Sequence, residues 1–252
     1  MANNGGRTMT IERDIAQELD EDLDVEIELV VLDLAGTTVR DDGLVERAFA
    51  LAAERTGIVD GDEQLAGALG YVRETMGQSK IDVFRALAAD DAAAERANEA
   101  FETAYLELAV QGGIEAIPGA EELLRQLRDF DVKIALVTGF SRATMDAILE
   151  VLGWAALVDV TLVPAEAGRG RPFPDLPLTA LMRVGASGTA GMVIVGDTAS
   201  DMLSGVNAGA GLIVGVLTGA HDRETLEAAG ADVVLDSIAE LAPLLGIDDV
   251  IE

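Results

Sequence analysis

The chain has 252 residues, half of them hydrophobic, which is enough for one large domain or for a core domain with a smaller second one. It contains no cysteine, and this excludes disulfides, thiolate metal sites and cysteine catalysis. The N-terminus lacks the apolar segment of a signal peptide, and no stretch has the roughly eighteen uninterrupted apolar residues of a membrane span. We therefore expect a soluble, cytoplasmic protein without a membrane partner.

The charge of the chain is strongly negative. Acidic residues number 46 against 17 basic ones, for a formal net charge of -29. Such a charge causes self-repulsion at low salt, which molar salt screens because the Debye length falls to about 3 Å. The large excess of acidic residues suggests a halophilic protein. The alternative is a moderately acidic protein from an ordinary cell. Nucleic acid is not expected as a partner, because a basic footprint is absent.

The first elements in chain order are a tail, a strand and a group of helices. Residues 1–24 predict an acidic N-terminal tail with a short helix near residues 10–20. The apolar run "ELVVLD" at residues 28–33 is typical of a buried parallel strand. Only helical patterns follow, over residues 44–57, 62–77, 79–90 and 92–110. A helical insert directly after the first strand predicts a cap domain with hinges near Gly43 and residues 112–119.

Beyond this insert, strands and helices alternate. Apolar runs at residues 133–139, 191–197, 212–219 and 232–237 predict strands, and helical spacing occupies residues 118–130, 141–153, 177–185 and 200–210. This alternation implies an α/β sheet of parallel strands. The predicted fold is a Rossmann-like core of residues 25–43 and 117–252, with an all-helical cap of residues 44–116 inserted into it.

Polar side chains follow three of the predicted strands. Asp33 ends the first strand, Thr138 ends the second, and Asp197 ends a later one, with Asp201 one helical turn on. Each residue alone could be an ordinary helix cap. The three together, in this order and spacing, are a more specific indication of a functional site. Crowded carboxylates without His or Cys nearby favour Mg²⁺. With Arg171 and backbone N–H groups they would bind a phosphorus oxyanion, which an aspartate could attack.

The order of these motifs resembles the haloacid dehalogenase superfamily, over nearly all of residues 28–240. In that superfamily the position two residues after the first aspartate is usually a second aspartate, and here it is Ala35. "DLAGTTV" is similar to the phosphonoacetaldehyde hydrolase (phosphonatase) branch, whose motif is D-x-A-G-T-T-V. Arg171 stands in that branch's G-R-P-[YF]-P pattern, and "MGQSKID" matches its M-G-x-x-K-I-D motif with Met76 and Lys80.

The resemblance implies a role for each matching residue. Asp33 would be the nucleophile, Lys80 would form a Schiff base with the substrate aldehyde, and Met76 would pack near it. The groups expected to hold Mg²⁺ and the substrate are then these: Asp33, the Ala35 carbonyl, Asp197 and Asp201 for the metal, and Thr37, Thr138, Gly139 and Arg171 for the phosphonyl group. Phosphonatases dimerise through the cap, so the resemblance also implies a homodimer.

Lysine usage draws further attention to Lys80. The chain has two lysines, Lys80 and Lys133, against fifteen arginines. Lys133 begins a predicted strand, where a solvated charge is ordinary. For Lys80 the alternatives are a solvated lysine near a helix start or a phosphate contact in an ordinary phosphatase. To attack a carbonyl, it must be neutral, which a desolvated pocket would favour.

The loss of the second acid at Ala35 has a chemical explanation. A phosphate ester has an oxygen leaving group that an acid can protonate, whereas C–P cleavage leaves a carbanion that needs an electron sink. A protonated imine on Lys80 supplies that sink. One departure is Val83, where the phosphonatase motif has a His, so the substrate could be another 2-oxoalkylphosphonate. The single His, His221, is interpreted as a polar group at a helix start.

Two other functions compete with C–P hydrolysis. The first is a phosphomonoesterase similar to phosphoglycolate phosphatases, against which Ala35 argues. The second is a non-catalytic ligand-binding descendant, which would require a broken site although nearly every motif residue is intact.

The net charge of -29 predicts a salt-dependent fold. Because salt screens like-charge repulsion, the melting temperature should rise steadily from dilute buffer to molar potassium chloride. Thermal melting followed by circular dichroism over a salt series measures this. A melting temperature that stays flat across the series would remove the halophile interpretation.

Overall fold

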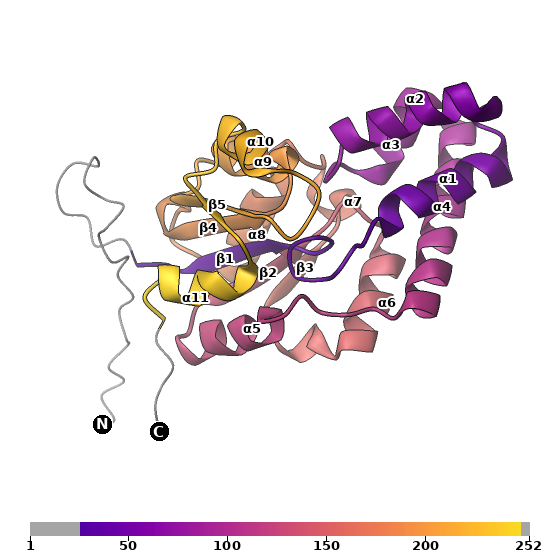
Figure 1. Cartoon of the computed structure of the whole chain (residues 1–252). Helices are drawn as coiled ribbons and strands as arrows, with labels where there is room; N and C mark the ends of the chain where they lie inside the picture. The colour runs from indigo at the N-terminus through magenta and orange to yellow at the C-terminus, as the bar shows by residue number, and fades with distance from the viewer. Residues whose placement is uncertain (1–25, 248–252) are drawn as a thin grey trace, which may run out of the picture.

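A computed structural model describes residues 26–247, so the predicted acidic tail and its helix near residues 10–20 lie outside the described part of the chain. Within it, six parallel strands form one sheet with the order β3-β2-β1-β4-β5-β6. The strands are β1 (Leu29–Asp33), β2 (Lys133–Val137), β3 (Val160–Leu162), β4 (Met192–Gly196), β5 (Leu212–Val216) and β6 (Val233–Leu235). Since β1 lies between β2 and β4, the chain's first strand is central in the sheet (Figure 1).

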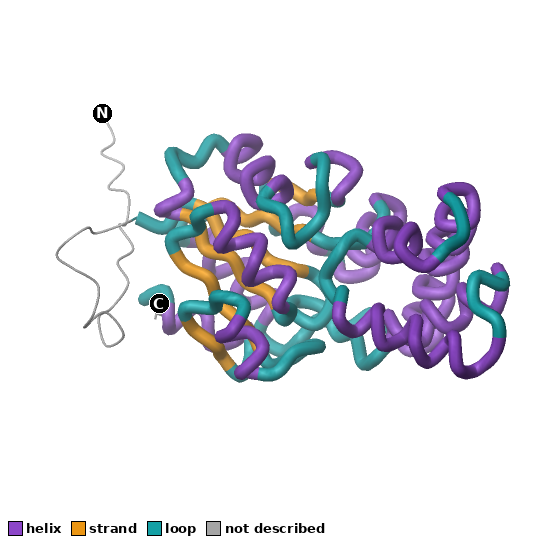
Figure 2. Tube along the Cα trace, turned by 90° about the horizontal axis from the view of Figure 1, so that it is seen from above, coloured by secondary structure: helices purple, strands orange, loops and turns teal. Residues whose placement is uncertain are grey.

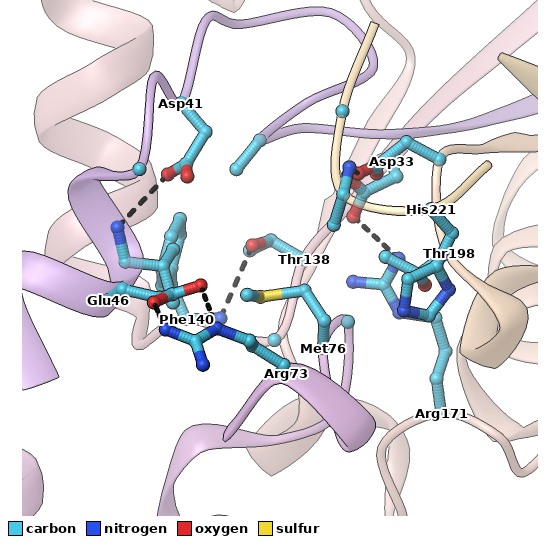
Figure 3. A pocket seen from close by; sticks show the side chains of 18 of the residues that line it. Asp33, Asp41, Glu46, Arg73, Met76, Thr138, Phe140, Arg171, Thr198 and His221 are labelled. Carbon is cyan, nitrogen blue, oxygen red and sulfur yellow. Dashed lines mark hydrogen bonds and ion pairs between the residues drawn. The ribbon is translucent and has the colours of Figure 1, made fainter. Parts of the chain in front are cut away.

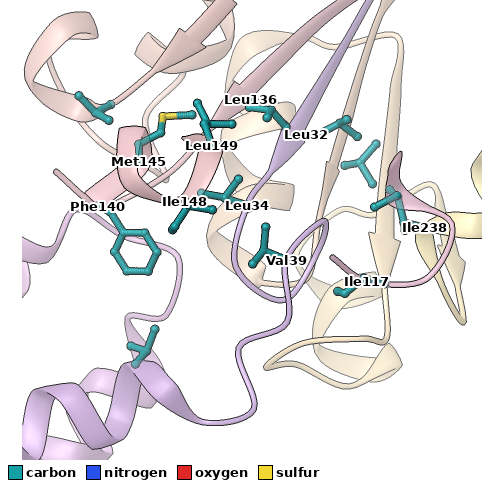
Figure 4. Packing of buried hydrophobic residues seen from close by; sticks show 14 of the residues in the cluster. Leu32, Leu34, Val39, Ile117, Leu136, Phe140, Met145, Ile148, Leu149 and Ile238 are labelled. Carbon is teal, nitrogen blue, oxygen red and sulfur yellow. The ribbon is translucent and has the colours of Figure 1, made fainter. Parts of the chain in front are cut away.

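Helices cover both faces of the sheet, which makes three layers. Successive residues of a strand point to opposite faces, so Val30 and Leu32 join one hydrophobic cluster while Leu29 and Val31 join another. The first cluster includes helices α5 (Ala120–Asp129), α6 (Arg142–Leu152) and α11 (Leu241–Leu244). Figure 4 shows the α6 side chains lying over Leu32 and neighbouring strand residues. The second cluster includes α8 (Asp175–Val184) and α9 (Ala199–Ala208).

Four helices follow β1 before the next strand: α1 (Leu44–Thr56), α2 (Gly61–Glu74), α3 (Lys80–Leu87) and α4 (Asp91–Gly112). They pack together at one end of the molecule, beside the sheet (Figures 1 and 2). The rings of Phe49 and Phe84 stack at 5.1 Å, and Phe84 contacts Phe101 in turn, which joins α1, α3 and α4. The predicted fold class, a Rossmann-like core with an inserted helical cap, is therefore confirmed. The domain boundaries at residues 43/44 and 116/117 stay a prediction.

One hydrogen-bonded contact ties the cap helices to the core. The carboxylate of Glu102, on α4, accepts hydrogen bonds from the Ser141 backbone N–H at 3.0 Å and from the Ser141 hydroxyl at 2.9 Å. It also accepts one from the Thr144 hydroxyl. Ser141 and Thr144 lie at the start of α6, where backbone N–H groups favour a negative charge. Glu102 thus holds α4 against the first turn of a core helix.

The remaining differences from the predicted elements are short. Strand β3 was not predicted, because its three residues lie at the sheet edge and carry no long apolar run. Helix α8 begins at Asp175, two residues before its predicted start. The short helices α7 (Pro164–Ala167) and α10 (Arg223–Ala228) complete the α-helices of the described residues. Among these residues, no helix has the length and apolarity needed to cross a membrane.

Candidate active site

The sheet topology brings the predicted polar residues to one edge. Asp33 ends β1, Thr138 follows β2, and Asp197 follows β4, and these three strands are neighbours. The carboxyl ends of parallel strands meet at the same edge, where open α/β sheets bind ligands. A cavity of about 390 Å³ lies there, and residues of both the core and the cap helices line it. Figure 3 shows Asp33 and Arg171 on one side of this cavity and Asp41 on the other, with Thr138 and Met76 between them.

The turn after β1 explains the sequence A-G-T-T. Gly36 has a left-handed φ of 90°, and a Cβ atom there would lie 2.5 Å from Oδ2 of Asp197, so the position requires glycine. The Thr37 hydroxyl donates to Oδ1 of Asp197 at 3.2 Å, and the Thr38 hydroxyl donates to the Asp33 carbonyl oxygen at 2.9 Å. Thr37 therefore contacts a carboxylate here, and its predicted contact with substrate stays a prediction.

Asp197 and Asp201 are each fixed by hydrogen bonds from neighbouring groups. Oδ2 of Asp197 accepts the Ala220 backbone N–H at 2.7 Å. Thr198 is the N-cap of α9 and forms a capping box with Asp201. The capping interpretation of "GDTASD" is thus correct for Thr198 and Asp201. It does not apply to Asp197, whose carboxylate is only 2% exposed at the strand end.

Arg171 pairs with two of these carboxylates at once. Its Nη1 donates to Oδ1 of Asp33 at 2.5 Å (Figure 3). The same Nη1 also donates to Oδ1 of Asp201. Its Nε has no hydrogen-bond partner among the described residues. Asp33, Asp197, Asp201 and Arg171 are all at most 5% exposed. One buried guanidinium therefore faces three buried carboxylates, which leaves an excess of negative charge.

This excess changes the acidity of the site. Burial raises the pKa of Asp33 to about 6, although the Arg171 charge opposes the shift. Burial also raises the pKa of Asp197 well above its usual range, and the charge of Asp33 adds to the effect. A further positive charge in the site would relieve both shifts.

The donor set fits a hard divalent cation in charge and in ligand type. Buried carboxylate oxygens without a His or Cys partner are the ligands that Mg²⁺ prefers. Among residues 26–247, no group of three or more His, Cys, Asp or Glu side chains is arranged so that it could hold a metal ion. The reason is that Asp33 and Asp201 both face Arg171, while Asp197 faces Thr37 and Ala220.

Lys80 lies in the same cavity and is not a solvated lysine. It is the first residue of α3, it is 8% exposed, and its Nζ lies 5.7 Å from the centre of the Phe140 ring. Its backbone N–H donates to the Gly139 carbonyl oxygen at 3.1 Å. Burial lowers the pKa of Lys80, and the charge of Arg171 lowers it further. This environment favours the neutral amine.

The other predicted residues near Lys80 also reach the cavity. Met76, Thr138 and Gly139 line it, as does Ala35. The Thr138 hydroxyl accepts the Phe140 backbone N–H at 3.2 Å, so it does not cap α6, whose N-cap is Ser141. A Cβ atom on Gly139 would lie 2.3 Å from the Gln78 carbonyl oxygen, and this close approach accounts for glycine there. The substrate contacts of these residues stay predictions.

Four residues that line the cavity were not predicted as site residues from the sequence: Asp41, Glu46, Arg73 and His221. Asp41 precedes α1, and Glu46 of α1 pairs with Arg73 of α2 through two hydrogen bonds of 2.8 and 2.6 Å. His221 lies at a helix start, as predicted, directly before Asp222, the N-cap of α10. Nδ1 of His221 accepts the Ala199 backbone N–H at 2.8 Å. These positions belong to no recognised motif, and a run such as "RDDG" predicts only a polar turn.

The fold and the site together define an α/β protein with buried carboxylates at the edge of a cavity, and comparisons with known proteins identify its family. A family model described as haloacid dehalogenase-like hydrolase matches residues 27–209. The phosphonoacetaldehyde hydrolase of Bacillus cereus is 30% identical over 216 residues, which cover 79% of this chain and 78% of that protein. "Probable phosphatase IndB" of Dickeya dadantii is 28% identical over 217 residues, which cover 84% and 91%.

Among solved structures, a hydrolase from Pseudomonas syringae has a TM-score of 0.75 at 26% identity and covers 86% of this chain and 97% of that one. The chain belongs to the haloacid dehalogenase-like hydrolase family, and it is a hydrolase. The resemblance to phosphonoacetaldehyde hydrolases that the sequence motifs predicted is confirmed.

The position of Asp33 leads to a prediction about activity. The sequence motif predicts that Asp33 is the nucleophile, so Asp33→Asn should lower turnover at least about a thousandfold. Steady-state phosphate release in the presence of Mg²⁺ measures this. Near-normal turnover of the variant would show that Asp33 does not attack phosphorus.

The same variant should be more stable than the wild type in metal-free buffer above pH 7. Burial raises the pKa of Asp33 to about 6, so the protonated carboxyl stabilises the fold at low pH and this contribution is lost as the pH rises through about 6. Melting temperatures of the variant and the wild type at pH 5 and pH 8 test the direction of this stability difference. The gap between Asp33→Asn and wild type should widen at pH 8; an unchanged gap would argue against a buried excess of charge.

Proposed function

We propose that this hydrolase cleaves the C–P bond of phosphonoacetaldehyde or a related 2-oxoalkylphosphonate. The observation that carries the proposal is Lys80, a desolvated lysine in the same cavity as Asp33 and Thr138. A lysine there can reach the carbonyl of a small substrate whose phosphonyl group lies at Asp33. The similarity to phosphonoacetaldehyde hydrolases supports the same substrate class.

The core residues would act on phosphorus. Asp33 would attack the phosphorus atom and form an aspartyl phosphate, which water then hydrolyses. Thr138 and Arg171 would donate hydrogen bonds to the phosphonyl oxygens, assisted by Thr37 and the Gly139 backbone. Asp33, Asp197 and the Ala35 carbonyl would hold Mg²⁺, with Asp201 supporting it. When bound, the ion would neutralise the surplus carboxylate charge and the phosphonyl oxygens.

The residues at the cap would act on the carbonyl. The neutral Lys80 amine would form an imine with the substrate, and the protonated imine would accept the electron pair of the breaking C–P bond. Met76 would pack beside the imine, where its apolar side chain helps to exclude water. Closure of the cap helices over the cavity would protect the imine from hydrolysis. Homodimerisation through this cap stays a prediction.

A phosphomonoesterase is the second candidate, because IndB is named a probable phosphatase. Ester cleavage profits from an acid that protonates the leaving oxygen, and Ala35 occupies the position where the superfamily carries that acid. Phosphate release from phosphonoacetaldehyde and from a panel of phosphate esters separates the two. A non-catalytic binding protein is less well supported, since Asp33, Asp197 and Lys80 are all in place.

Lys80→Arg distinguishes an imine-forming lysine from a phosphate contact. Arginine keeps the positive charge but stays protonated, so it cannot form the imine. We expect the variant to lose at least about a thousandfold in phosphate release from phosphonoacetaldehyde while it keeps its fold. Borohydride with the wild type should trap substrate carbon on Lys80, as intact-protein and peptide mass spectrometry would detect.

Lys133→Arg is the matched control. Lys133 is the chain's second lysine; it is exposed and its Nζ lies 3.5 Å from Asp159, outside the cavity. Its replacement should leave activity and trapping unchanged. A well-folded Lys80→Arg enzyme with most of its activity would overturn C–P hydrolysis and favour the phosphatase.

A further inference from the structure

Imine formation needs a proton donor beside Lys80. The amine nitrogen attacks the carbonyl carbon, and the carbonyl oxygen later leaves as water, which requires two protons on that oxygen. Lys80 must be neutral to attack, so it supplies only one of them. Three residues on from Lys80 is Val83, which is apolar and 4% exposed. The donor must therefore come from another element of the cavity.

The charged groups that influence Lys80 are Arg171, Asp41, Asp33 and Glu102. Arg171 does not release a proton in proteins. The carboxylate of Asp33 is paired with Arg171. Both oxygens of Glu102 accept hydrogen bonds from Ser141, and one accepts a further bond from Thr144. By elimination, Asp41 is the carboxyl group that remains as a proton donor for imine formation at Lys80.

The position of Asp41 supports this assignment. Asp41 lines the cavity between the β1 turn and α1, and its carboxylate lies across the cavity from Asp33 (Figure 3). Oδ1 accepts the Val45 backbone N–H at 3.2 Å, and the Asp41 carbonyl accepts the Leu44 N–H at 2.8 Å. These bonds fix the residue at the cavity, and the Gly43 backbone N–H also lowers the pKa of its carboxyl group.

The remaining neighbours of Asp41 leave it free to carry a proton. Arg47 is the nearby cation on α1, but its Nη1 donates to the Asp42 carbonyl at 2.7 Å. The Tyr105 side chain of α4 packs against the Phe140 ring at 4.5 Å, and burial raises the pKa of its hydroxyl beyond the range of an acid catalyst. Burial raises the pKa of Asp41 as well, towards the range in which a carboxyl group can donate a proton.

We propose that Asp41 is the proton-transfer residue for imine formation at Lys80, an inference that rests on the proposed function. The C–N bond forms as the amine attacks, and one amine proton passes to the carbonyl oxygen to give a carbinolamine. Asp41, protonated, then gives its proton to the carbinolamine hydroxyl. The C–O bond breaks, water leaves, and the nitrogen lone pair completes the protonated imine. The balance is one aldehyde, one amine and one carboxylic acid to one iminium, one water and one carboxylate.

Asp41→Asn tests the assignment, because asparagine keeps an oxygen for the Val45 N–H but cannot donate an acidic proton. The rate of imine formation is measured by quenching wild type and variant with borohydride at timed intervals and counting labelled Lys80 by mass spectrometry. We expect this rate to fall at least about a hundredfold, the usual contribution of general acid catalysis. Asp41→Ser, which also retains a hydrogen-bond acceptor, should show the same loss, and it serves if the Asn variant does not fold.

Asp42→Asn is the matched control, since it removes the same charge from the next residue, whose side chain is exposed. It should form the imine at a rate within about threefold of wild type. Asp41 variants that are folded and form the imine within that range would overturn the proposal, as would an equal loss in Asp42→Asn. If the wild type itself forms no trapped imine, then the proposed function fails, and this outcome is distinct from a failure of Asp41 alone.

Discussion

Burial of three carboxylates against a single guanidinium is the constraint on which the rest of the site depends. Asp33, Asp197 and Asp201 are at most 5% exposed, and Arg171 pairs with Asp33 and Asp201. A buried charge is tolerated when it is paired and hydrogen-bonded. The Ala220 N–H and the α9 capping box supply hydrogen bonds to Asp197 and Asp201, and Gly36 leaves room for the Asp197 carboxylate. Local sequence features far apart in the chain therefore support one cluster of charges.

The cavity has a core half and a cap half. The core half is acidic and polar, and its residues follow strand ends. The cap half contributes Lys80 at the start of α3, whose Nζ lies 5.7 Å from the centre of the Phe140 ring of the core. Burial of Lys80 lowers its pKa. The Glu102 contact with Ser141 keeps the two halves together, so that lysine and aspartate face one cavity.

The parts of this structure that were predictable from sequence are those set by local patterns. The apolar runs identified five of the six strands, and D-x-A-G-T-T, T-G and G-D-T-x-S-D located the residues at strand ends. Strand β3 was missed because an edge strand of three residues carries little periodicity. Asp41, Glu46, Arg73 and His221 were missed for another reason: segments far apart in the sequence bring them to one cavity, and no local pattern encodes that arrangement.

The identity of the leaving group explains where the acid stands. In ester cleavage the departing atom is the oxygen bonded to phosphorus, so an acid two residues after the nucleophile is well placed to protonate it. In C–P cleavage the departing carbon is stabilised through the imine, and the protons move at the carbonyl end of the substrate instead. This chain has Ala35 two residues after Asp33, and Asp41 lies across the cavity from Asp33, in the cavity that Lys80 also lines. Under the proposed C–P hydrolysis, the absence of a carboxyl at position 35 and the presence of one at position 41 are two consequences of the same change in leaving group.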